Sequence, residues 1–254
     1  RDGKTLEVAL SQIGKTNLLK EVRRPLGARF EIDYIRTGNT YAQPHSKFVV
    51  AEVRLFDGVA EDTPAKYTDK GSDWQRHSYA YENGQYDRFE RDFLGYATVI
   101  STQHDTAGLH GGTLKAADLK DTPAFRRTVQ HYSNNHVYNK GLLLKETLFD
   151  ASTGADKPYI ETANTYDFWK LRDSVTSSTD PLNLDRFKER ATTVLFPRLL
   201  ETRKTYYEGK SQAGPSSYTS HGYDALGNIT DFAEGGSGVD TVNAHIEYEH
   251  CNDT

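Results

Sequence analysis

Alternating apolar and polar residues are the dominant pattern of this chain. In residues 28–34, aromatic and aliphatic side chains take every second position and charged side chains lie between them. Residues 47–56 are the next expected strand, in which Ala51, Val53 and Leu55 alternate with Glu52 and Arg54. A period of two is that of a β-strand with one packed face and one solvated face. The pattern therefore predicts an antiparallel β-sheet. Further strands are expected at residues 17–27, 77–81, 126–132, 142–149, 159–169, 193–207 and 242–249, and a hairpin is expected at 218–232.

Turn-forming residues separate these segments. Residues 24–27 (Arg-Pro-Leu-Gly) predict a turn that joins the first two strands as a hairpin. Residues 83–84 (Asn-Gly) are the strongest short-range hairpin signal in the chain and predict a second tight turn. Proline cannot donate to a sheet ladder, so Pro197, inside the segment 193–207, predicts a sheet edge or a bulge.

The segment 86–100 is expected to be a strand bent at Gly95. Within it Phe89, Arg91 and Phe93 would share one face of the sheet, because they are two residues apart. Loops are expected at 38–46, 57–73, 106–122, 150–158, 174–180, 209–217 and 235–238, and short helices at 114–120 and 180–190.

The stretch 222–232 reads Gly-Tyr-Asp-Ala-Leu-Gly-Asn-Ile-Thr-Asp-Phe. Its alternation stops after Asp224 and resumes at Ile229. Asp side chains bond backbone donors two residues on, and Gly and Asn tolerate positive φ, so residues 224–228 predict a tight hairpin turn. We expect Asp224 to close this turn and Tyr223 to pack on the neighbouring strand.

Composition narrows the class of protein. The 254 residues have a net charge of -5 and only 36% hydrophobic residues, which is low for a compact α/β enzyme. The charges form no basic block, so nucleic-acid binding is not expected. No apolar run approaches the roughly 18 residues of a membrane helix, so direct membrane insertion is not expected either. Cys251 is the single cysteine, which excludes an internal disulfide and a cysteine-based zinc site. The chain starts at Arg1, contains no Met and shows no signal-peptide pattern, which suggests an internal piece of a longer protein.

The histidines do not show the spacing of a metal site. No His-Glu-x-x-His or similar local pair occurs, and 131/136 and 245/250 are each five residues apart. We expect these histidines to be structural or solvated. The nine are His45, His77, His104, His110, His131, His136, His221, His245 and His250.

Carboxylates and nucleophiles give no stronger signal. Glu90 with Asp92, or Asp224 with Asp231, resembles a glycosidase pair, but charges alternating on a wet sheet face predict the same spacing. No Gly-x-Ser-x-Gly elbow occurs, and Cys251 has no evident partner. Residues 14–16 (Gly-Lys-Thr) match only the end of a phosphate loop, since position 9 is Ala rather than Gly. We therefore predict no catalytic, cofactor-binding or metal-binding residues.

Tyrosines are the remaining candidates for ligand contacts. Aromatic side chains stack on sugars, but cross-strand aromatic pairs also stabilise sheets by about 0.2–1 kcal/mol each. Packing is therefore the expected role, and carbohydrate binding is the alternative. The candidates are Tyr79, Tyr81, Tyr86, Tyr206 and Tyr207.

Four stretches together carry a family resemblance. Residues 81–96 (Tyr-Glu-Asn-Gly-Gln-Tyr-Asp-Arg-Phe-Glu-Arg-Asp-Phe-Leu-Gly-Tyr), 138–146, 195–209 and the Tyr-Asp stretch at 223–224 follow one another in the same order as in the YD-repeat (Rhs) family. The chain resembles, in particular, the B component of insecticidal toxin complexes and similar virulence-plasmid toxins. The resemblance covers about residues 15–250. It departs from the family at Asp92, where many relatives carry Glu.

The resemblance implies more than the pattern alone does. Irregular strand spacing by itself gives an antiparallel sheet built as a degenerate repeat array. The family implies that hairpins of this kind form a curved section of a large hollow shell. It also implies that residues 1–254 are a single YD/Rhs-repeat-type β region.

The implied function is structural and non-enzymatic. Relatives enclose a C-terminal toxic domain for delivery, so the expected partners are the rest of the shell, the enclosed domain and possibly a companion toxin-complex component. The expected location is secreted or on the bacterial cell surface. The alternative is a surface adhesin or carbohydrate-binding β module. A hydrolase has no supporting set of residues.

Overall fold

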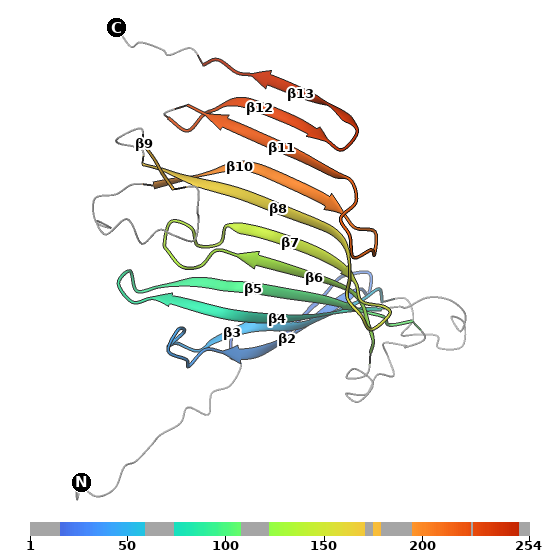
Figure 1. Ribbon diagram of the computed structural model, residues 1–254. Helices are drawn as coiled ribbons and strands as arrows, with labels where there is room; N and C mark the ends of the chain where they lie inside the picture. The colour runs from blue at the N-terminus through green and yellow to red at the C-terminus, as the bar shows by residue number, and fades with distance from the viewer. Residues whose placement is uncertain are drawn as a thin grey trace, which may run out of the picture.

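The computed structural model describes residues 16–58, 74–107, 122–170, 175–178, 195–224 and 226–248. These residues form one antiparallel sheet, in which nearly every strand pairs with the strands before and after it in the sequence (Figure 1). The order is β1 to β8 and then β10 to β13, with β9 pairing only with β8. The strands are β1 (Glu21–Arg23), β2 (Arg29–Thr37), β3 (Lys47–Phe56), β4 (Trp74–Asp87), β5 (Asp92–His104), β6 (Ala124–Tyr132), β7 (Leu143–Asp150), β8 (Lys157–Lys170), β9 (Val175–Ser178), β10 (Leu195–Tyr206), β11 (Ser216–Tyr223), β12 (Ile229–Gly236) and β13 (Val239–His245).

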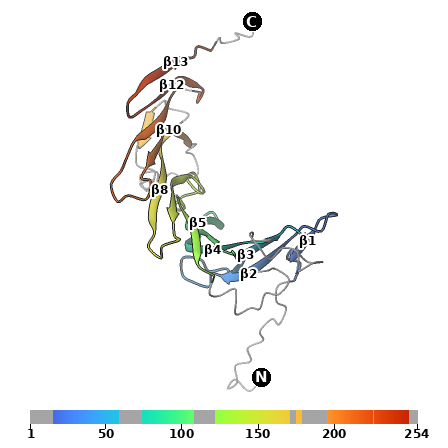
Figure 2. The same ribbon diagram turned by 90° about the vertical axis from the view of Figure 1, so that its right-hand side faces the viewer.

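The sheet is a single curved layer. Seen from the side, it bends between the N-terminal and C-terminal strands (Figure 2). Only six apolar side chains of the described residues are buried, so no continuous core forms on either face: Phe56, Trp74, Leu94, Ala151, Phe168 and Leu195. The expected fold class, all-β and antiparallel, is confirmed. The part of the chain that the structure describes contains no helix.

A small core does lie under the loop between β6 and β7. Tyr138 and Leu142 from this loop pack against the buried Phe168 of β8 and Leu195 of β10. The loop folds back on itself, because Asn139 is fully buried and its Oδ1 accepts the His136 N–H (3.0 Å).

Several strand and turn predictions are confirmed closely. The alternating segment 47–56 is β3 with the same bounds. The turn at residues 24–27 joins β1 to β2, with Arg24 N–H donating to the Ala28 carbonyl at 2.7 Å. Pro197 pairs with Phe168 of β8, whereas the described register of β10 with β11 runs only from residue 201 to 205. Pro197 therefore lies at a local edge, where no donor is required of it.

The prediction of a hairpin turn at Asn83-Gly84 is wrong. β4 continues through both residues, and its register with β5 is the same at Glu82 as at Gly84 and Gln85. Asn83 does adopt positive φ (56°), as its residue type allows. The Asn134 side chain donates to its carbonyl at 2.8 Å. The Asn-Gly pair serves a close approach, since a Cβ at Gly84 would lie 2.2 Å from Gln43 Oε1.

The turn lies instead at residues 88–91. Asp87 Oδ1 accepts the backbone N–H groups of Phe89 (2.8 Å) and Glu90 (3.2 Å), and Arg91 has φ 56°. Phe89 and Arg91 are turn residues, so they do not share a strand face with Phe93 as expected. The Asp side chain decides the turn here, because it satisfies two donors at once.

Other boundaries also differ. Residues 174–180 were expected as a loop, but they contain β9. The last strand ends at His245 rather than at residue 249. The loops and helices expected within 59–73, 108–121 and 179–194 lie outside the described residues.

Candidate functional site

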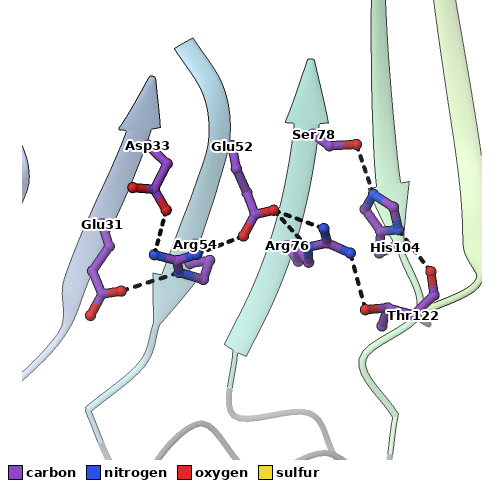
Figure 3. A network of polar contacts seen from close by, with 8 residues as sticks. All are labelled: Glu31, Asp33, Glu52, Arg54, Arg76, Ser78, His104 and Thr122. Atoms are coloured by element: carbon purple, nitrogen blue, oxygen red, sulfur yellow. Dashed lines mark hydrogen bonds and ion pairs between the residues drawn. The ribbon is translucent and has the colours of Figure 1, made fainter. Parts of the chain in front are cut away.

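A ladder of charged side chains crosses one face of β2, β3 and β4 (Figure 3). Arg54 of β3 donates from Nε to Glu31 Oε2 (3.1 Å) and from Nη2 to Asp33 Oδ2 (2.9 Å). Its Nη1 donates to Glu52 Oε1 (2.7 Å). The other oxygen of Glu52 accepts from Arg76 of β4 at 2.8 and 3.0 Å. We call this side of the sheet the ladder face.

The register explains the ladder. Glu31 stands directly opposite Arg54, and Arg54 stands directly opposite Arg76, so two like charges meet between β3 and β4. Glu52, two residues before Arg54 on β3, accepts from both arginines and offsets their repulsion. Burial works against the charge of Arg54, yet the carboxylates of Glu52 and Asp33 raise its pKa. The side chains of Arg54 and Arg76 are only 17% and 12% exposed. The ladder thus keeps charged groups neutralised on a face that carries no covering layer in the described residues.

A serine–histidine pair ends the ladder at β5. Ser78 Oγ lies 2.8 Å from His104 Nε2, and His104 Nδ1 lies 3.0 Å from the Thr122 carbonyl oxygen. A carbonyl only accepts, so Nδ1 carries the proton of the neutral ring and Nε2 accepts from Ser78. Burial lowers the pKa of His104, and the charge of Arg76 lowers it further. The ring is therefore neutral at pH 7.

This pair has the hydrogen bonds of an activated serine but not its surroundings. A serine nucleophile also needs donors for the developing oxyanion. The neighbouring Arg76 guanidinium is already bonded to Glu52 and to Thr122 Oγ1 (3.0 Å). Ser78 lies in mid-strand, where backbone N–H groups belong to the pairing with β3 and β5. The arrangement fits a polar end to the ladder better than it fits catalysis.

A second charged pair is buried between β8 and β10. Asp167 and Arg198 stand opposite each other and form two hydrogen bonds, of which Nε to Oδ1 measures 2.7 Å. Their side chains are 4% and 7% exposed. The guanidinium carbon lies 3.9 Å from the centre of the Trp169 ring and 5.6 Å from that of Tyr223. The pair therefore links β8 and β10 to the end of β11.

The turn expected at residues 224–228 is confirmed. Asp224 Oδ1 accepts the N–H groups of Leu226 (2.8 Å) and Asn228 (2.9 Å), and Oδ2 accepts from the Asn228 side chain (2.8 Å). These donors lower the pKa of Asp224, with the Asn228 side chain contributing most. Tyr223 donates its hydroxyl to the Leu199 carbonyl of β10 at 2.9 Å. Tyrosine and aspartate thus have the structural roles expected of them.

The two carboxylate pairs are not brought together. Glu90 lies in the turn that precedes β5, while Asp92 forms an ion pair with Lys140, which lowers the pKa of Asp92. Asp224 is occupied by its own turn. Asp231 bonds His245 Nδ1 at 2.8 Å on the exposed surface of β12 and β13.

The histidines and tyrosines are also dispersed. Among the described residues, no group of three or more His, Cys, Asp and Glu side chains is placed to hold a metal ion. His110, His250 and Cys251 lie outside them. Tyr81 packs on Tyr96, with ring centres 5.0 Å apart, and Tyr86 packs on His45 at 5.1 Å. No helix of the described chain is both long and apolar enough to cross a membrane.

Sequence reasoning missed the buried Asp167–Arg198 pair. The two residues are 31 positions apart and come from alternating segments whose polar positions looked solvated. The available signal was Pro197, which predicts a local sheet edge next to Arg198. A side chain of a neighbouring strand can pack against an arginine at such an edge, as Asp167 of β8 does.

Part of the sequence matches a known protein family. The family described as "Insecticide toxin TcdB middle/N-terminal region" matches residues 4–120, a little under half of the chain. This part of the chain is therefore similar to the middle/N-terminal region of a toxin-complex B component. No curated protein sequence matches it.

Solved structures of toxin complexes share the fold of this chain. TcdB2-TccC3 without its hypervariable C-terminal region superposes with a TM-score of 0.59 at 15% identity. The TcdB2-TccC3-Cdc42 structure gives 0.58 at 17%, and the Photorhabdus luminescens Tc holotoxin pore gives 0.59 at 16%. Each match covers 85% of this chain but only 12% of the longer one.

Proposed function

We propose that this chain is a structural, non-enzymatic section of a bacterial toxin shell that encloses a C-terminal toxic domain for delivery. The observation that carries the proposal is the match of nearly the whole sheet to a small part of TcdB2-TccC3. A piece that corresponds to 12% of a larger chain fits a section of a wall better than it fits a self-contained module.

The architecture supports a wall. A single curved layer with few buried apolar side chains separates two solvent spaces with the least polypeptide. Within the described part of the chain both edges are open, since β1 and β13 each pair with one strand only. Unpaired edges are the places where a longer sheet continues. The charged ladder lets one face stay wet without leaving buried charges unpaired.

The partners follow from the same proposal. They are the remaining wall, of which residues 1–254 would be one continuous YD/Rhs-repeat-type region, the enclosed domain, and a companion toxin-complex component. Names of the matching structures include TccC3 and a holotoxin, which supports a companion chain. The protein would act outside the bacterium or at its surface.

Two adjacent residues allow a direct test of the wall. Arg203 and Lys204 are both exposed, and successive residues of a strand point to opposite faces. Each would be replaced by cysteine in a Cys251→Ser background, and the rate of labelling by a bulky polyethylene-glycol maleimide would be measured.

In the isolated chain both cysteines should react at similar rates. In the full-length protein one should be protected and the other should remain reactive, because the reagent cannot enter a closed shell. Opening the protein with urea should restore the protected rate. Equal reactivity of both positions in the intact full-length protein would contradict enclosure and would favour an open module such as an adhesin.

A further inference from the structure

A groove crosses the middle of the sheet on the side opposite the ladder face. It consists of two hollows, of about 390 and 250 Å³, that share Arg126 and Leu148. The larger is lined by the rings of Phe125, Phe149 and Tyr159 and by Asp150 and Ser152. The smaller is lined by polar side chains of β4, β5 and β6. We call this feature the Arg126 groove.

Strand register places the polar walls side by side. Gln103 of β5 stands opposite both His77 of β4 and Arg126 of β6. Arg126 in turn stands opposite Asp150 of β7. The side chains therefore form a row perpendicular to the strands, and the groove runs across the sheet rather than along it.

Arg126 differs from the other strand arginines of the sheet that carry ion pairs. Arg54, Arg76 and Arg198 each contact carboxylates. Arg126 is exposed and donates to the neutral Gln103 Oε1 at 2.8 Å, and no carboxylate of the described residues forms an ion pair with it. The opposing Asp150 accepts the Ser152 N–H at 2.9 Å instead. The groove thus holds a guanidinium with unused donors at its centre.

The neighbours of Arg126 suit an anion with an apolar part. Burial lowers the pKa of His77, and the Arg126 charge adds to the effect, so the ring is neutral at pH 7 and adds a hydrogen-bonding nitrogen without a second charge. On the other side, the rings of Phe125 and Tyr159 are 51% and 42% exposed and are accessible to a ligand in the larger hollow. An aromatic wall beside an arginine is the composition of protein recognition sites.

We propose that the Arg126 groove binds an extended peptide segment that places a carboxylate side chain against Arg126 and a neighbouring apolar side chain in the Phe125–Tyr159 hollow. The larger hollow, about 390 Å³, accommodates one large side chain. Arginine donates two parallel hydrogen bonds to a carboxylate, which fixes the orientation of the segment.

We assign the peptide segment to the enclosed polypeptide, and this assignment rests on the proposed function. Lys204 lies on the same face as Arg126, through the register Gln130 to Glu146 to Thr162 to Lys204. Protection of a cysteine at 204 would place the groove inside the shell, and protection at 203 would place it outside. Peptide binding by the chain is tested independently of either result.

The test uses the 254-residue chain and two synthetic peptides, acetyl-Gly-Phe-Glu-Gly-amide and the same peptide with Gln in place of Glu. Isothermal titration should show that the Glu peptide binds more tightly than the Gln peptide. Arg126→Gln should weaken binding of the Glu peptide by about tenfold, the loss of one charge-assisted bond pair, and leave the Gln peptide unchanged. Phe125→Ala should weaken both peptides.

Arg203→Gln is the matched control. It removes the same charge from the opposite face, at an exposed residue that pairs with Glu201 on its own strand. Binding of the Glu peptide should be unchanged in this variant. The proposal is wrong if wild-type chain binds neither peptide, if it binds both equally, or if Arg203→Gln weakens the Glu peptide as much as Arg126→Gln does.

Discussion

The buried Asp167–Arg198 pair gives the sharpest test of how the C-terminal hairpins are held. Replacing Asp167 by Leu leaves the Arg198 guanidinium buried, with a side chain 7% exposed and the rings of Trp169 and Tyr223 beside it. Removing one partner of a buried ion pair costs about 3–5 kcal/mol. The face of Trp169 offsets up to about 2 kcal/mol for a desolvated cation. We therefore expect a loss near 3 kcal/mol in the free energy of unfolding.

Urea unfolding followed by tryptophan fluorescence measures this loss. With a slope of about 2–3 kcal/mol per molar, the midpoint should fall by about 1–1.5 M at unchanged slope. The double variant Asp167→Leu with Arg198→Met should recover most of the loss, because no charge is then buried. Glu201→Ala, which breaks the exposed pair with Arg203, should cost less than about 1 kcal/mol. If Asp167→Leu cost no more than Glu201→Ala, the pair would not be buried as described.

Three further outcomes are expected. Tyr223→Phe removes the bond to the Leu199 carbonyl and should destabilise the chain by about 1 kcal/mol in the same urea assay, and wild-type stability would exclude that bond. The pKa of His104 is lowered in the folded chain, so the unfolded chain binds the extra proton. Stability should therefore fall as pH drops through 6.5, and His104→Asn should flatten this decline, whereas an unchanged pH profile would contradict it. The open edge of β13 should make the isolated chain self-associate in sedimentation, and Asn243→Pro should weaken this association without unfolding, while a monomer at high concentration would show a protected edge.

The choice of Asn243 for the proline depends on which backbone N–H groups of β13 face outward. The structure gives their direction, and the sequence does not. The alternation of residues 242–249 first suggests Ile246 as the site for a proline. Ile246 N–H, however, donates inward to the Thr230 carbonyl of β12 at 2.7 Å. Outward donors of an edge strand alternate with inward ones, so residues at odd positions such as Asn243 face solvent. Sequence alternation gives the side-chain faces but not the direction of these donors.

The sequence predicts an element correctly where one local interaction or pattern determines it. β3 is predicted to the residue because its segment is rich in β-branched and aromatic residues and alternates from Ala51 to Leu55. The turn at 224–228 was predicted because Asp224 satisfies its own neighbours. Asn83 does adopt the positive φ that its residue type favours, but it does so inside β4 rather than in a turn. Contacts of Asn134 with Asn83 and of Gln43 with Gly84 stabilise this arrangement.

Long-range pairing could not be predicted in the same way. Arg126 and Arg198 both sit at polar positions of alternating strands, yet one is exposed beside a groove and the other is buried on Asp167. Which of these environments an arginine meets depends on strand register and on which loops fold over the sheet. A single sequence does not contain that information in any local stretch.

The most direct test of the account is an electron cryomicroscopy map of the full-length protein. We expect β1 to β13 to form one layer of a closed shell wall, with neighbouring strands of the same wall paired to β1 and β13. Density for polypeptide should lie within the enclosed space. A map in which a second protein layer covers the sheet face to face, or in which both faces open to bulk solvent, would contradict it.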